Sequence, residues 1–263
     1  MQTVTSKDGT IIAYEKLGAG PAVILVGGAM TIHSDLTPLA QLLASDFTVI
    51  NYDRRGRGDS TDTNPFSVER EIEDIKALID ATGGTAYLFG ISSGGALALE
   101  ATIFLANKVK KLAVYEIPYD ASEVGIKAWH EYTAKLSEFI TADRRGDSVA
   151  LFMKFVGVPD EMVTGMRQAP FWQGMEKVAP TLLYDAAVLG QDRVIPSERV
   201  KNLTAQTFVI DGGGSLSTMP FMHVTALALA KVLPNAKQQT LEGQTHDVDM
   251  KVLAPVLGKF FKE

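Results

Sequence analysis

Short apolar runs alternate along the chain with longer segments of helical periodicity. The runs at 22–26, 47–53, 86–91 and 111–117 predict strands, and the segments at 35–44, 67–81 and 94–107 predict helices. This alternation is typical of a mostly parallel, doubly wound α/β sheet, whose strands are apolar because helices cover both faces. The opening segment differs, because it turns at Asp8 and Gly9 and predicts an N-terminal antiparallel hairpin at the sheet edge.

The alternation stops after Pro118. Residues 121–190 carry only helical patterns, with several aromatic and methionine side chains, and strand patterns resume at 207–211 and 238–243, each followed by a helix (219–233 and 249–262). We therefore predict a core made of residues 1–118 and 198–263, interrupted by a helical cap insert at 119–197.

Composition narrows the classes of function. The chain is 46% apolar and 21% charged, which predicts a folded domain, and its net charge of −6 includes no basic tract that could bind nucleic acid. We expect a cytoplasmic protein with a small-molecule substrate and no membrane partner, because no leader or membrane-spanning run is evident. The absence of cysteine excludes disulfides, thiolate metal sites and a cysteine nucleophile. We expect neither a metal nor a cofactor, and the oligomeric state stays open.

The stretch Gly90-Ile91-Ser92-Ser93-Gly94 joins a predicted strand to a predicted helix. It fits the G-x-S-x-G pattern, in which a sharp turn exposes the central serine and flanking glycines avoid clashes with the neighbouring chain. Ser92 is therefore the candidate nucleophile. Ser93 is expected to contribute its backbone N–H, which is free at the helix N-terminus and favours an oxyanion. The alternative is a glycine-rich turn with a serine cap.

Two further segments support a catalytic role for Ser92. Gly27, Gly28 and Ala29 follow the first parallel strand, where small residues would let the N–H of Ala29 approach the reacting centre as the second oxyanion donor. His246 follows the last strand, late in the chain, where a general base would be needed. We expect its Nε2 within hydrogen-bond reach of Ser92 Oγ.

The segment at 51–60, NYDRRGRGDS, resembles the D-x-R-G-x-G-x-S segment of the α/β-hydrolase superfamily, in the branch with a serine nucleophile and a helical cap. The resemblance covers nearly the whole chain. It implies Ser92 as nucleophile, His246 as base, and the N–H groups of Ala29 and Ser93 as the oxyanion hole. One departure is Gly27, which stands where the family usually has a histidine.

The third member of the triad is harder to assign. The family usually places an acid in a G-x-x-D turn after the strand at 207–211, but this turn reads GGGS and has Ser215 at the acid position. Some members place the acid after the preceding strand instead, where Glu116 stands, so Glu116 is the first candidate. Asp211 is the second and Asp120 the third. A carboxylate that only caps a turn, and a Ser-His dyad without an acid, stay open.

A serine nucleophile favours acyl transfer to water, so the predicted function is a carboxylic ester hydrolase that forms an acyl-enzyme on Ser92. The apolar cap suggests a small, largely apolar substrate. The alternatives are a cofactor-free haloperoxidase or perhydrolase and a C–C bond hydrolase with the same triad. A non-catalytic ligand receptor or pseudoenzyme on the same fold is the alternative of another class.

Further residues are assigned outside the triad and the oxyanion hole. The predicted substrate pocket consists of Gly28, His33, Trp129, Phe155 and Trp172. His130 and His223 are expected on helix surfaces or in the cap. The acidic and basic group at 53–57 is expected to form structural ion pairs rather than an anion site.

Overall fold

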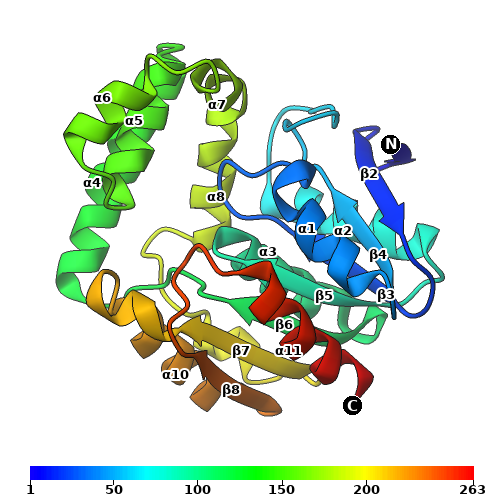
Figure 1. The fold of residues 1–263 in the computed structure, drawn as a ribbon. Helices are drawn as coiled ribbons and strands as arrows, with labels where there is room; N and C mark the ends of the chain where they lie inside the picture. Colours follow the sequence, from blue (N-terminus) through cyan, green and yellow to red (C-terminus); the bar gives the residue numbers. More distant parts are fainter.

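The structure, a computed structural model, describes residues 1–263. One eight-stranded sheet runs through the molecule in the order β1-β2-β4-β3-β5-β6-β7-β8 (Figure 1). The strands are β1 (Gln2–Thr5), β2 (Ile11–Leu17), β3 (Ala22–Val26), β4 (Thr48–Tyr52), β5 (Ala86–Ile91), β6 (Val109–Tyr115), β7 (Gln206–Gly212) and β8 (Ala236–Leu241). Strands β3 to β8 are parallel, while β1 and β2 pair antiparallel at one edge. The predicted α/β class and N-terminal hairpin are therefore confirmed.

Helices cover both faces of this sheet. The helices are α1 (His33–Leu43), α2 (Val68–Ala81), α3 (Ser93–Leu105), α4 (Glu123–Thr141), α5 (Arg145–Phe155), α6 (Asp160–Met166), α7 (Trp172–Val178), α8 (Leu182–Leu189), α9 (Ser197–Val200), α10 (Phe221–Val232) and α11 (Met250–Lys262), with short 3-10 turns η1 (Ala106–Lys108), η2 (Ala179–Thr181) and η3 (Gly213–Ser217). Helices α1 and α11 pack in a cluster on one face, and α2, α3 and α10 contribute to the cluster on the other.

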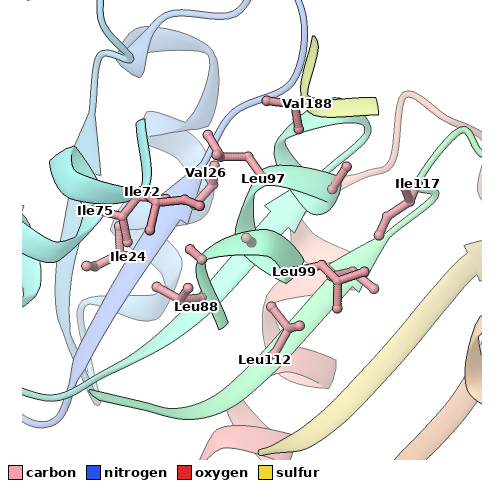
Figure 2. Close-up of a cluster of buried hydrophobic side chains, with 14 of the residues drawn as sticks. Ile24, Val26, Ile72, Ile75, Leu88, Leu97, Leu99, Leu112, Ile117 and Val188 are labelled. Carbon is pink, nitrogen blue, oxygen red and sulfur yellow. The ribbon is translucent and has the colours of Figure 1, made fainter. Parts of the chain in front are cut away.

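Alternating apolar residues explain why the central strands are covered on both sides. Ile24 of β3 belongs to the cluster under α2 and α3, while its neighbours Val23 and Leu25 belong to the cluster under α1 and α11. Figure 2 shows part of the first cluster, with Val26 of β3 beside Leu97 of α3. These layers hold the carboxyl ends of the strands at one edge, where ligands bind in open parallel sheets.

Helices α4 to α8 all lie between β6 and β7 in the chain, and we call this segment the cap. Figure 1 shows α4 to α7 as a group to one side of the sheet, from which α8 leads back toward α3. Helix α8 packs directly on α3, so the cap contacts the core at the helix that follows β5. No helix in the chain combines the length and the apolar character needed to cross a bilayer.

Candidate active site

Ser92 occupies a strained turn between β5 and α3. Its φ of 57° and ψ of −133° lie where few residues other than glycine are found, and such backbone strain persists only where the surrounding structure enforces it. A Cβ added to Gly94 would clash with the carbonyl oxygens of Val26 and Gly27, so only glycine fits there. The N–H of Ser92 donates to the carbonyl of Tyr115 over 2.9 Å. The turn is therefore hydrogen-bonded to the end of β6 and packed against the end of β3, and these contacts hold Ser92 above the sheet edge.

The oxyanion loop predicted from the sequence lies against this serine. A Cβ on Gly28 would stand 3.0 Å from the Cβ of Ser92, which shows how closely the two backbones approach. The N–H of Ala29 makes no hydrogen bond within the protein. Ser93 is the first residue of α3, so its N–H has no partner within the helix. Two unpaired donors are therefore available beside Ser92.

His246 and Glu116 are brought together from segments 130 residues apart. Nδ1 of His246 lies 2.8 Å from Oε2 of Glu116, and Oε1 of Glu116 accepts the N–H of Gly212 over 2.9 Å. The carboxylate is fully buried, whereas the imidazole is 32% exposed. Glu116 has a φ of 46°, a second strained backbone position, at the end of β6. The buried carboxylate can hold a proton on Nδ1 and leave Nε2 free to accept another.

The contact expected between His246 Nε2 and Ser92 Oγ is not among the hydrogen bonds of this structure, in which the ring is held through Nδ1 alone. Catalytic hydrogen bonds are often long before substrate binds.

The loop that carries His246 is held by Tyr115 and by the glycines after β7. The hydroxyl of Tyr115 donates to the carbonyl of Thr245 over 2.6 Å. Burial raises the pKa of Tyr115, and the charges of Glu116 and Asp211 raise it further, so the phenol stays a donor. Gly214 N–H donates to the carbonyl of Gln244 over 2.7 Å. The GGGS turn therefore supports the histidine loop instead of supplying an acid.

The other two candidate acids lie elsewhere. Asp211 accepts from Gln238 and Thr240, and its Oδ2 lies 2.8 Å from Nδ1 of His223. His223 lies on helix α10 with its side chain 30% exposed, and it is paired with this buried carboxylate. Asp120 accepts the N–H and hydroxyl of Ser122 at the start of the cap. Neither aspartate contacts His246.

Apart from Gly28, which lies against Ser92, the predicted pocket residues fall into three places. Trp129 and Phe155 belong to an aromatic group in the cap, in which Phe155 stacks on Tyr132 with ring centroids 4.3 Å apart. His33 begins α1, where its N–H and ring both contact Asp53. Trp172 lies in a separate small cluster of the cap and donates to Glu176. The structure therefore does not gather these side chains into one lining.

His130 lies on an exposed helix face in the cap, beside Asp192.

The arginines of the 51–60 segment are bound by protein carboxylates. Arg54 forms a two-point pair with Glu71 and also bonds Asp185, and Arg57 bonds the other oxygen of Asp185. Burial acts to lower the pKa of Arg54, but Glu71 and Asp185 outweigh it and hold that pKa above its ordinary value. Structural ion pairs occupy these side chains, so they are not free to hold an anion.

Asp185 is a functional candidate that was not predicted from the sequence. This carboxylate lies on α8 and is 4% exposed, and it bonds the hydroxyl of Ser93 as well as the two arginines. One signal was present, since Asp185 is the only charge in the apolar run LLYDAAVL. A charge within an apolar helix is almost always paired when buried.

Comparisons with known proteins agree with this fold. A crystal structure of an alpha/beta hydrolase from Sphaerobacter thermophilus DSM 20745 is 48% identical, with a TM-score of 0.89 over 99% of this chain and 100% of that one. An uncharacterized hydrolase of Bacillus subtilis (strain 168) is 33% identical over 41% of each chain. The 3-oxoadipate enol-lactonase 1 of Acinetobacter baylyi is 28% identical over 42% of this chain and 43% of the relative.

The matches to these curated relatives thus span less than half the length of either relative. The model of the alpha/beta hydrolase family, in contrast, matches residues 23–250, which include the serine turn, the arginine segment, the cap and the histidine loop. The chain belongs to the alpha/beta hydrolase family.

Proposed function

We propose that this protein is a serine hydrolase that cleaves small, largely apolar carboxylic esters through an acyl-enzyme on Ser92. The observation that carries the proposal is the pairing of the buried Glu116 carboxylate with His246 at the sheet edge that also carries the strained Ser92 turn. An acid that orients a histidine, together with a serine beside two free N–H groups, is the arrangement that acyl transfer requires.

The proposed reaction has two steps. Ser92 Oγ attacks the ester carbonyl while Nε2 of His246 takes its proton, and the N–H groups of Ala29 and Ser93 bind the oxyanion that forms. His246 then gives the proton to the leaving alcohol, which leaves the acyl group on Ser92. Water, activated by the same nitrogen, releases the acid. Glu116 keeps the proton on Nδ1 throughout and stabilises the imidazolium.

The aromatic group in the cap supports an apolar substrate. Trp129 and Tyr132 lie with ring centroids 5.5 Å apart, and Phe155 completes the group. Ala29 and Met30 pack against the large apolar cluster that includes Trp129 and Tyr132. Apolar lining with a few polar groups is the usual character of a small-molecule site. The lactonase named among the relatives acts on a cyclic ester by its name, which makes lactones a sensible second set of test substrates.

A fluorophosphonate probe tests the proposal. We expect one adduct, which mass spectrometry maps to Ser92, and no labelling of Ser92→Ala. Ser93→Ala tests the position of the adduct, because it keeps Ser92 and the backbone N–H of residue 93; its adduct should still map to Ser92, at a lower rate of labelling. A folded protein without label, or with label on Ser93, contradicts the assignment and favours a receptor without catalysis.

Turnover of p-nitrophenyl esters of increasing acyl length then defines the substrate class. Activity only with peroxide and halide, or only on a β-diketone-like substrate, would replace the ester hydrolase with a perhydrolase or a C–C bond hydrolase.

A further inference from the structure

One buried carboxylate is connected by hydrogen bonds to both sides of the proposed oxyanion hole, directly on one side and through an arginine on the other. Oδ1 of Asp185 accepts the hydroxyl of Ser93 over 2.8 Å and Arg54 Nη1 over 2.6 Å, and Oδ2 accepts Arg57 Nη2 over 2.7 Å. Arg57 in turn donates through Nη1 to the carbonyl of Gly28 over 2.5 Å. Asp185 is therefore one hydrogen bond from Ser93 and two from the loop beside Ser92.

The bond to Gly28 matters because of peptide geometry. The carbonyl of Gly28 and the N–H of Ala29 belong to the same planar trans peptide and point in opposite directions. When Arg57 holds the carbonyl on one side, the N–H of Ala29 is turned to the other. Arg54 acts in the same way, since its Nη1 lies 3.3 Å from the carbonyl of Gly27. The arginines thus fix the planes of the peptides that face the serine.

Alternative orientations of the loop are costly. Arg54, Arg57 and Asp185 are each no more than 5% exposed, so each would leave a buried charge unpaired if it moved. Arg57 is also held by the hydroxyl of Thr181 over 2.9 Å, just before α8. Burial acts to raise the pKa of Asp185, but Arg57 and Arg54 outweigh it and hold the pKa below its ordinary value. The carboxylate therefore stays charged near neutral pH.

We propose that Asp185 is a positioning residue that aligns the two oxyanion donors, an inference that rests on the proposed function. It aligns the N–H of Ala29 through Arg57, and the N–H of Ser93 through the Ser93 hydroxyl. Because Asp185 belongs to the cap, the oxyanion donors are aligned only when α8 packs on α3. A cap that lifts or shifts loses transition-state stabilisation even when the serine, histidine and acid are undisturbed.

The test compares two isosteric substitutions in neighbouring ion pairs. Asp185→Asn removes the charge that holds Arg57. Asp74→Asn is the matched control, since Asp74 is equally buried and forms a two-point pair with Arg55, but touches neither the loop nor Ser93. Both variants should lower the thermal midpoint. The active-site concentration of each is set by fluorophosphonate titration, and kcat and KM are measured with p-nitrophenyl acetate.

We expect Asp185→Asn to lower kcat about 10–100-fold and the labelling rate similarly, with KM within about threefold. Losing one oxyanion donor costs about 10²–10³ in kcat, and a displaced donor costs part of that. Asp74→Asn should keep kcat within about twofold of wild type. The proposal is overturned if Asp185→Asn, while folded, keeps wild-type kcat, or if Asp74→Asn loses as much.

A second variant serves if Asp185→Asn does not fold. Arg57→Lys keeps the charge, but one ammonium cannot reach Asp185, Gly28 and Thr181 together, so kcat should fall at least tenfold; an unchanged kcat contradicts the proposal. Wild-type labelling separates the two claims. If the fluorophosphonate does not label Ser92 in the wild-type protein, the proposed function is overturned and this inference with it. If it labels Ser92 in the wild type and Asp185→Asn keeps the wild-type kcat, this inference alone is overturned.

Discussion

Replacing Glu116 by glutamine tests the proposed triad acid, which stands after a different strand from the one the family usually uses. Oε1 of Glu116 accepts the N–H of Gly212, and Oε2 faces His246 Nδ1. In the variant the amide oxygen keeps the bond to Gly212, so the NH₂ group must face the imidazole. Two donors cannot share that contact, and His246 is forced to carry its proton on Nε2. A histidine in that tautomer cannot accept the proton of Ser92.

The size of the loss follows from the same contact. The reaction creates an imidazolium beside Glu116, and two unit charges about 4 Å apart interact by about 4 kcal/mol at an effective dielectric constant of about 20. At about 1.4 kcal/mol per factor of ten, removing the charge alone lowers kcat about 10³-fold. The wrong tautomer adds to this, so we expect a loss of about 10³–10⁴-fold, with KM little changed because the ground state does not use the imidazolium.

The assay measures kcat and KM on p-nitrophenyl acetate for enzyme whose fold is verified by circular dichroism and thermal unfolding. Asp211→Asn is the matched control, because Asp211 is an equally buried strand-end carboxylate that pairs with His223 instead. It should lose less than about tenfold. If Glu116→Gln stays within tenfold of wild type, or Asp211→Asn falls as far, the assignment of Glu116 is refuted.

Three further expectations concern stability and the serine turn. Gly94→Ala should lower the free energy of unfolding by about 1–3 kcal/mol, because the new Cβ meets two backbone carbonyls. Gly165→Ala is the control, because Gly165 on α6 faces open space, and this variant should be neutral or stabilising in chemical denaturation. Asp8→Asn should destabilise by about 1–3 kcal/mol at pH 7, since Asp8 accepts from Arg55 and Arg70. Burial acts to raise the pKa of Asp8, but its hydrogen bonds outweigh burial and lower the pKa from 3.8, so this stability is fully present above about pH 4 and shrinks as pH falls toward the lowered pKa. A difference between variant and wild type that is as large at pH 2 as at pH 7 contradicts the reasoning. Tyr115→Phe should lower kcat several-fold by freeing the Thr245 carbonyl, and an unchanged kcat would show that the His246 loop does not need this bond.

Much of the fold was predictable because the local pattern of apolar residues indicates strands and helices directly. The helix predicted at 249–262 is observed as Met250–Lys262, and the strand predicted at 22–26 has those bounds in the structure. Apolar periodicity reflects which faces are buried, so it places elements well. The serine turn was also visible, because glycines on both sides of Ser92 are a local requirement of a tight strand-to-helix turn.

Partners within the site were less accessible to sequence reasoning. Glu116 could be ranked first among the acids, but Asp211 stands at an equivalent strand end and differs only in which histidine lies above it. That choice depends on where α10 and the histidine loop pass over the sheet. The aromatic residues grouped in one predicted pocket also separated, because the cap buries Trp172 in a cluster of its own.

The sequence by itself determined the order of strands and helices, the position of the cap in the chain and the candidate nucleophile, since each depends on residues within a few positions of one another. Only the tertiary structure decided that Glu116 meets His246 and that Asp185 meets Arg57, across 130 and 128 residues. The physical reason is that a buried charge must find a partner, but sequence does not say which. The partner is set by the packing of whole layers, and that packing is a property of the folded chain.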